Sequence, residues 1–136
     1  MKRGFTLMEL LIVIAVIGIL ISISTVAYTS AQKKTRDSRR RSDLKAVQNG
    51  FEQYYADNSN NYPATCSLST TYMPNGMPTD PKTGTAYTAT AGWYSCSTSA
   101  YCVCAALEGE TNATTNCSGG APPSGYTGFY CVKNVQ

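Results

Sequence analysis

The chain has 136 residues, with eleven Lys and Arg against eight Asp and Glu and no His, for a formal net charge of +3. This length predicts one domain plus terminal segments. With no His and no nucleophile or paired-carboxylate motif, the sequence predicts no catalytic residues, no cofactor and no enzyme activity.

An apolar segment lies near the N-terminus. Residues 5–23 are nineteen residues with a single charge, Glu9, about the length that crosses a bilayer as a helix. They have no polar face, which disfavours the core helix of a soluble domain. A secretory signal cut at residues 29–31 and a plain membrane anchor are alternatives. Two basic residues precede the span and seven follow it closely, so the positive-inside rule taken alone places the rest of the chain in the cytoplasm.

The start of this segment resembles a known processing signal. Residues 4–10 read Gly-Phe-Thr-Leu-Met-Glu-Leu, and with the basic residues before and the apolar run after they resemble the cleavage and methylation motif of type IV prepilins. That family includes the pseudopilins of type II secretion and DNA-uptake machines. The resemblance implies cleavage after Gly4 by a prepilin peptidase, N-methylation of Phe5, and Glu9 as the acid at the fifth mature position. One departure is Val26, where many pilins have a helix-distorting proline.

The cost of a charge inside a membrane also suggests a role for Glu9, independently of the resemblance. An ionisable group inside a membrane span costs about 2.5–3.5 kcal/mol on insertion scales, so it needs a partner or a function. A free amine on Phe5, in the same chain or in a neighbouring copy, can supply that partner. Because an unpaired buried charge is strongly destabilising, Glu9 is the candidate assembly residue that selects the register between copies.

A basic segment and then an amphipathic segment follow. Seven Lys and Arg lie between Lys33 and Lys45, and no proline interrupts the chain before Asp57. One helix over residues 5–57 is therefore predicted, about 80 Å long at 1.5 Å per residue, and residues 58–63 end it. Its second half carries an apolar stripe at helical spacing, formed by Leu44, Val47, Phe51 and Tyr54.

The basic segment has several interpretations. It can contact anionic lipid head groups before assembly, pair with acids of neighbouring subunits, bind nucleic acid, or form a solvated face balanced by Asp37 and Asp43. Between Lys33 and Asp43 there is no apolar residue, so this part is expected to pack on no core of its own.

Six cysteines lie in the last region, which indicates a disulfide framework made outside the cytosol. In a head of 79 residues, each bridge typically contributes about 2–4 kcal/mol. Fifteen pairings are possible, and the sequence does not choose among them. A zinc site is disfavoured because the cysteine spacing is wrong and no His is present. The candidates are Cys66, Cys96, Cys102, Cys104, Cys117 and Cys131. The prepilin resemblance implies a Cys117–Cys131 bridge that closes a C-terminal loop.

The head is predicted to be a small antiparallel sheet. Strand character occurs in residues 85–88 and 93–96, as two arms around Ala91-Gly92, and in residues 101–107 and 129–133. The fold class is therefore α+β: a long N-terminal helix packs by its second half on a disulfide-stapled sheet of three to four strands, as the resemblance also implies. Glu108 and Glu110 have too few neighbouring oxygen ligands for a metal to be assigned.

The chain thus divides into a leader (1–4), a membrane-spanning and filament-core helix half (5–32), a basic then amphipathic helix half (33–57) and a head (58–136). The resemblance implies a structural subunit of a type IV pilus-like filament, serving adhesion, motility or uptake. Its partners would be copies of itself in a helical filament, the prepilin peptidase, an inner-membrane assembly platform, and membrane lipid before assembly. The precursor would lie in the cytoplasmic membrane with its N-terminus inside and its head outside, and the assembled subunit in a cell-surface pilus.

Two alternatives belong to the same resemblance. One is a type II secretion pseudopilin, although such proteins often bind calcium in an acidic loop that this head lacks. The other is a minor pilin of DNA uptake. Two Lys against three acids in the head give no firm case for nucleic acid, because phosphate binding requires a basic surface.

Overall fold

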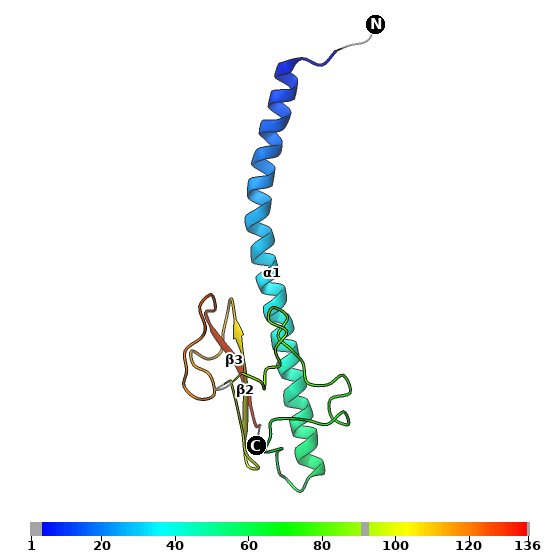
Figure 1. The fold of residues 1–136 in the computed structure, drawn as a ribbon, viewed down its shortest axis with the longest axis vertical. Coiled ribbons are helices and arrows are strands. Elements are labelled where there is room, and N and C mark those ends of the chain that lie inside the picture. Colours follow the sequence, from blue (N-terminus) through cyan, green and yellow to red (C-terminus); the bar gives the residue numbers. More distant parts are fainter. Residues whose placement is uncertain (1–3, 91–92, 136) are drawn as a thin grey trace. The chain divides into compact units, whose positions relative to one another are not determined.

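The computed structural model describes residues 4–90 and 93–135, apart from the side chain of Val26. The elements are α1 (Leu7–Asp57), β1 (Tyr94–Cys96), β2 (Tyr101–Leu107) and β3 (Gly128–Lys133), shown in Figure 1. The chain divides into two compact units, Met1–Lys33 and Lys34–Gln136, which are described separately. Leader residues 1–3 and the turn expected at Ala91-Gly92 lie outside the described residues.

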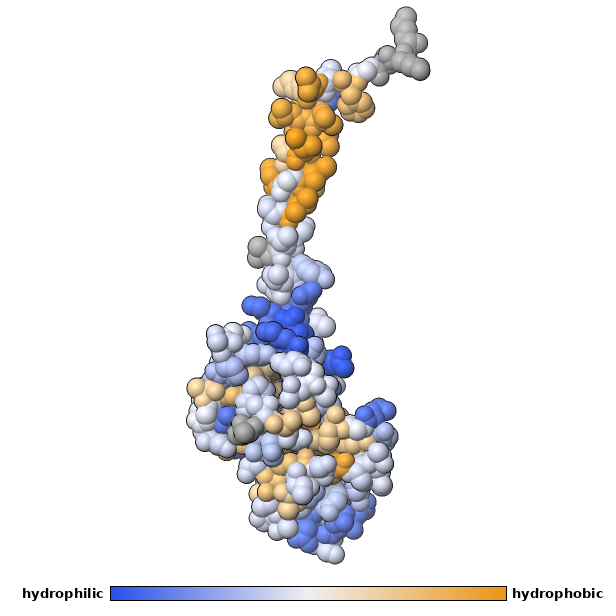
Figure 2. Space-filling view, in the orientation of Figure 1, coloured by the Kyte–Doolittle hydropathy of each residue, from blue (hydrophilic) through white to orange (hydrophobic). Residues whose placement is uncertain are grey.

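The first unit contains the N-terminal part of α1, and its apolar side chains are exposed. Leu7 is 87 % exposed and Ile23 is 65 % exposed, with the large aliphatic residues between them similarly open. Figure 2 shows this surface as a continuous hydrophobic stretch. By length and composition, α1 can cross a membrane, as the sequence predicts.

The second unit has its core between α1 and the sheet. Leu44, Val47 and Phe51 are fully buried, and Tyr54 packs against them at the edge of the cluster. Figure 1 shows β2 and β3 lying alongside the C-terminal part of α1. The ring of Phe51 stacks on that of Tyr101 with centroids 4.5 Å apart, so the predicted apolar stripe is the face on which the sheet packs.

The sheet is antiparallel with the strand order β1-β2-β3. Side chains on successive residues of a strand point to opposite faces. On β2, Tyr101, Val103 and Ala105 join the core against α1, whereas Cys104 and Ala106 join a second cluster with Phe129. The strand predicted for residues 101–107 is therefore confirmed, and its two faces enter different clusters.

Residues 85–88 do not form the strand that the sequence predicts. They contribute only an isolated bridge between Thr79 and Ala86, and β1 pairs with β2 instead. The physical reason is that this segment lies against α1, where Tyr87 is buried and its hydroxyl donates to Asp43 Oδ2 at 3.1 Å. The buried tyrosine holds the segment on the helix and away from the sheet.

The end of α1 confirms the predicted stop. The helix ends at Asp57, and the side chain of Asn58 donates to the Tyr54 carbonyl at 2.8 Å. Ser59 and Asn60 then take positive φ angles of 53° and 59°, which a helix cannot contain. The whole is an α+β fold of one long helix, a three-stranded sheet and disulfides, which confirms the predicted fold class.

Candidate functional site

The N-terminus of α1 is capped by three reciprocal hydrogen bonds between Thr6 and Glu9. The Thr6 N–H and hydroxyl donate to Glu9 Oε2 at 2.9 and 2.8 Å, and the Glu9 N–H donates back to Thr6 Oγ1 at 3.2 Å. This is a capping box, which satisfies N–H groups that the first helical turn leaves without partners. Reasoning from the sequence missed the role of Thr6, although the Thr-x-x-Glu spacing was its signal.

Gly4 and Phe5 precede the helix. No atom lies within 4 Å of the position that a Cβ on Gly4 would occupy, and Phe5 is 86 % exposed. Nothing within the described chain therefore demands a glycine at this position, and both residues that flank this peptide bond are exposed.

A cluster of charges lies where α1 meets the head. Arg40 is completely buried although it carries a charge. Its guanidinium donates to Asp80 at 2.6 and 3.2 Å, to Asp37 at 2.8 Å and to Glu108 at 3.2 Å. The guanidinium carbon, Cζ, also lies 5.4 Å from the ring centroid of Tyr126. Burial lowers the pKa of Arg40, but the carboxylates around it raise that pKa by more, so it stays a cation.

Glu108 and Asp80 are held as carboxylates by these cations. Arg36 donates to both oxygens of Glu108 at 2.8 Å, and Lys82 Nζ lies 4.0 Å away. The hydrogen bonds from Arg36 outweigh the effect of burial and lower the pKa of Glu108 to about 2. Burial raises the pKa of Asp80, but hydrogen bonds from Arg40 and from two backbone N–H groups lower it by more. Three cations therefore face three carboxylates, counting Asp37.

This cluster corrects the expectation that the basic segment packs on no core. Arg36 and Arg40 form ion pairs with acids of their own chain, so these two side chains are not available to bind lipid, nucleic acid or a neighbouring subunit. Arg41 donates to the Glu110 carbonyl and lies over the Tyr130 ring, 5.6 Å from its centroid. The sequence could not reveal these pairs because the partner of Arg36 lies 72 residues away.

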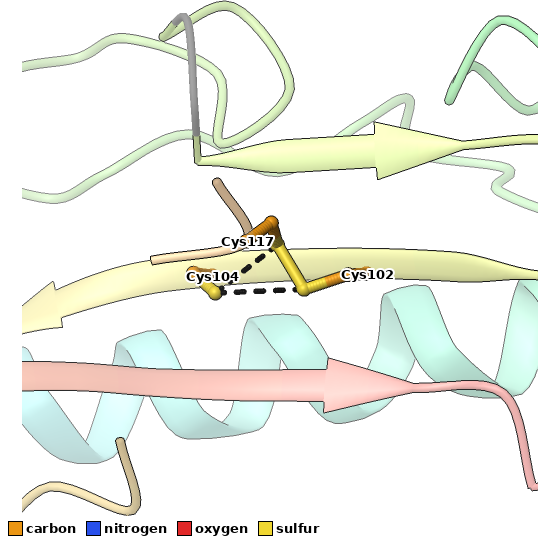
Figure 3. Close-up of side chains that lie close together, drawn as sticks. All are labelled: Cys102, Cys104 and Cys117. Atoms are coloured by element: carbon orange, nitrogen blue, oxygen red, sulfur yellow. Dashed lines mark hydrogen bonds between the residues drawn. A yellow bond between two sulfur atoms is a disulfide. The ribbon is translucent and has the colours of Figure 1, made fainter. Parts of the chain in front are cut away.

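The structure pairs all six cysteines, as Cys66–Cys96, Cys102–Cys117 and Cys104–Cys131. The bridge between Cys117 and Cys131 that the resemblance implied is wrong. Cys131 lies directly opposite Cys104 in the register of β2 and β3, so these two sulfurs join. The loop that carries Cys117 folds over the same face of β2, where Cys117 forms a disulfide with Cys102 (Figure 3).

Two groups of side chains can be examined as metal ligands. The sulfurs of Cys102, Cys104 and Cys117 lie within 4.8 Å of one another, but all three belong to disulfides and offer no thiolate. Glu108 faces Arg36 and Arg40, whereas Glu110 is exposed. Neither group presents a free set of ligands in this form of the protein.

Comparisons with known proteins bear on the N-terminal motif. Residues 1–25 match the family described as the prokaryotic N-terminal methylation motif. The chain is 36 % identical over 64 residues to the type II secretion system core protein G of Escherichia coli K12, covering 47 % of this chain and 43 % of that protein. The corresponding protein of Aeromonas hydrophila is 37 % identical over 64 residues, covering 47 % of this chain and 44 % of that protein.

A pilin is also among the relatives. The type IV major pilin protein PilA of Myxococcus xanthus DK1622 is 36 % identical over 56 residues, covering 41 % of this chain and 26 % of that protein. The chain spans less than half the length of these curated relatives. No solved structure gives a significant match.

The matched motif covers the capped start of α1 and the exposed apolar surface that follows it. Together these features fit a membrane-anchored precursor. The protein therefore carries the prepilin-type N-terminal methylation motif and is related, over about half of its length, to type IV pilins and type II secretion pseudopilins.

Proposed function

We propose that this protein is a structural subunit of a type IV pilus-like extracellular filament. The observation that carries the proposal is the start of α1, where a prepilin motif leads into a helix with an exposed apolar surface. Burying one large aliphatic side chain is worth about 1.5–3 kcal/mol, so this surface requires an apolar environment. The membrane supplies it before assembly, and the same helix of neighbouring copies supplies it in a filament.

The maturation steps belong to the same proposal. A prepilin peptidase cuts the open peptide bond after Gly4, and Phe5 becomes the N-methylated first residue. The exported head receives its three disulfides, and an inner-membrane assembly platform then moves the subunit from the membrane into the filament. The apolar half of α1 and the six paired cysteines support this order of compartments.

Glu9 is given the role of selecting the register between copies. In a bundle of apolar helices an unpaired carboxylate is costly, so a subunit docks where the amine of Phe5, in its own chain or a neighbour's, can meet it. Through the capping box with Thr6, Glu9 also stabilises the N-terminus of α1. The two roles are separable, because glutamine can replace glutamate in a capping box but carries no charge.

The test is a set of three variants in the native host. Glu9→Gln and Glu9→Ala are expected to insert and to be cleaved normally but to yield few or no filaments. Thr6→Ala removes a cap worth about 0.5–2 kcal/mol and keeps the charge, so filaments are expected at reduced or normal yield. Filament yield is measured on fibres sheared from cells, and cleavage by peptide mass. Normal yield from Glu9→Gln would refute the register role.

A type II secretion pseudopilin is the second candidate, and the similarity to core protein G of several bacteria supports it. Such a subunit would form a short filament that drives secretion. Electron microscopy separates the two: long surface fibres labelled by an antibody to the head indicate a pilus, whereas a secretion defect in the deletion strain without fibres indicates a pseudopilin. A minor pilin of DNA uptake would instead show salt-dependent DNA binding.

A further inference from the structure

Sulfur atoms of two disulfides lie close together on one face of β2. Cys104 Sγ lies 3.3 Å from Cys117 Sγ and 3.8 Å from Cys102 Sγ, although Cys104 is bonded to Cys131 and the other two are bonded to each other. Figure 3 shows the Cys104 sulfur beside the Cys102–Cys117 bond. The third bridge belongs to the other core cluster.

The four cysteines differ in their access to solvent. Cys104 is completely buried, whereas Cys102, Cys117 and Cys131 are half-buried. These three line one groove of about 390 Å³, which Cys104 does not line, and Lys133 also borders it. Of the two residues in the Cys104–Cys131 bridge, Cys131 is therefore the one that a small thiol meets in the groove.

We propose that this groove is a thiol–disulfide exchange site that takes a low-molecular-weight thiol of the glutathione type, with Cys104 as the internal nucleophile. The thiol enters at Cys131, and Lys133 favours a thiol that carries carboxylates. The contact between Cys104 and the Cys102–Cys117 bridge then carries the exchange to the second disulfide. This inference concerns the head alone and is independent of the filament role.

Two balanced steps describe the exchange. In the first, the external thiolate attacks the Cys131 sulfur, the Cys104–Cys131 bond breaks, and Cys104 leaves as a thiolate while Cys131 becomes a mixed disulfide. In the second, the Cys104 thiolate attacks the Cys117 sulfur, a Cys104–Cys117 bond forms, and Cys102 leaves as a thiolate that takes a proton from water. No oxidant or reductant other than the entering thiol is needed.

Cys117 is the sulfur that we expect to be attacked. In the disulfide-bonded state Cys104 lies side-on to the Cys102–Cys117 bond, so the freed Cys104 side chain has to rotate until it approaches Cys117 from the side opposite Cys102. Cys117 is the closer of the two, and a bond from Cys104 to Cys102 would join positions two apart on an extended strand. Such positions are roughly 6.6 Å apart, near the upper limit that a disulfide spans. In the second step the thiolate moves from a buried position to a half-buried one, where water stabilises the charge.

The consequence is that the pairings among these four cysteines interconvert in the folded head. Run in reverse, the same two steps take a head that holds Cys104–Cys117 and a mixed disulfide on Cys131 to the pairing of the structure, because closing the Cys104–Cys131 bond releases the external thiol. The Cys66–Cys96 bridge has no such route, because its sulfurs lie in the other cluster, with Cys66 buried in the core.

The first test uses the full chain with Cys131→Ser, purified in detergent without reductant and incubated at mildly alkaline pH. After acid quenching, denaturation and alkylation, peptide mass analysis locates the free thiol. We expect alkylated Cys102 together with a Cys104–Cys117 cross-link. The control, Cys96→Ser, is expected to carry its label on Cys66 alone, with both other bridges unchanged. Label confined to Cys104, with Cys102–Cys117 intact, would overturn the proposal.

The second test uses the unaltered chain and does not depend on the folding of a variant. Brief treatment with dilute glutathione is followed by the same quenching and mapping. Glutathione on Cys131 with a free thiol on Cys102 supports the relay. Glutathione on Cys131 with the free thiol on Cys104, or first attack at Cys66 or Cys96, rules it out.

Discussion

Arg40 is the residue on which the joint between helix and head depends. Its side chain has no exposed area, yet each of its acidic partners is at hydrogen-bond distance. Burying a charge is tolerated only when it is paired and hydrogen-bonded, and a guanidinium can serve several carboxylates at once because its donors form a planar fork. Arg40 thereby binds Asp80, which lies 40 positions further along the chain, and Glu108, which lies 68 positions further along.

Replacing Arg40 by alanine is expected to cost about 3–5 kcal/mol of unfolding free energy, because it leaves buried carboxylates facing one another without a cation. The measurement is urea unfolding followed by fluorescence of Trp93, the one tryptophan, which packs 5.5 Å from Phe129. The exposed neighbour Arg39 provides the control, since Arg39→Ala is expected to change stability by about 0.5 kcal/mol at most. Equal effects from the two variants would contradict the role given to Arg40.

Glu108 should make the stability of the head depend on acid. Its pKa in the folded protein is lowered to about 2, below the value of about 4.3 for an unfolded glutamate. The stabilisation is therefore complete above the unfolded pKa and is lost as pH falls from about 5 to 2. Asp80, whose pKa is also lowered, acts in the same direction.

The expected result is a melting temperature that falls over this pH range, with a shallower fall in Glu108→Gln. Glu110→Gln removes an equal charge from an exposed position of the same segment and should leave the slope of the unaltered chain. A Glu108→Gln variant with an unchanged slope would show that other carboxylates account for the acid dependence.

Gly50 lies inside α1, although glycine has a low helix propensity. Glycine is about 1 kcal/mol less favourable than alanine inside a helix. At this position, however, a Cβ would lie 2.8 Å from Leu68 Cδ1 and 3.2 Å from Met73 Sδ. The missing side chain lets the segment after the helix approach the helix backbone, and Leu68 joins the core there.

Gly50→Val is therefore expected to destabilise the head by about 1–3 kcal/mol through overpacking. Asn49→Val places the same side chain on the exposed neighbouring position and should change stability by about 0.5 kcal/mol or less. The two variants are compared by urea unfolding. If Gly50→Val were as stable as the unaltered chain, Leu68 would have room to move and the close approach would not be a constraint.

At the scale of the whole molecule, the two units obtain their stability in different ways. The large apolar side chains of the first unit are exposed and require an apolar environment. The second unit has its own core, three disulfides and a neutral cluster of paired charges. The proposed processing at Gly4 concerns the first unit alone, so it can be tested without disturbing the head.

A Gly4→Val substitution is expected to block maturation, because the open geometry around Gly4 leaves the requirement for a small residue to the peptidase. Intact-mass analysis without reduction is the measurement. The unaltered chain should begin at methylated Phe5 and be lighter by the hydrogens of three disulfides, whereas the variant should begin at Met1. Gly18→Ala, where no neighbouring atom lies within 4 Å of the added Cβ, should mature normally. A correctly trimmed Gly4→Val product would refute the cleavage site.

Several features of this protein followed from local sequence alone. Three short-range patterns carry them: the apolar run with its single charge, the Gly-Phe-Thr-Leu-Met-Glu signature, and the spacing of Leu44, Val47 and Phe51. The length of the run predicts a membrane-spanning helix, and the signature resembles a processing signal. The spacing predicts a packed helix face, because helical periodicity brings residues three or four apart to one side. The alternation on β2 is also a short-range pattern, because successive side chains of a strand point to opposite faces.

Other features depended on contacts between residues far apart in the chain. The charge pattern of the sequence could not predict that Arg36 pairs with Glu108 or that Arg40 is buried. An ion pair depends on distance in space, and Glu108 lies 72 residues from Arg36 and 68 from Arg40 along the chain. Tyr87 holds residues 85–88 on α1, against their strand propensity. The cysteine pairing followed from the register that sets Cys104 opposite Cys131. Only the tertiary structure decided these points, because each depends on which distant segments the fold brings within contact.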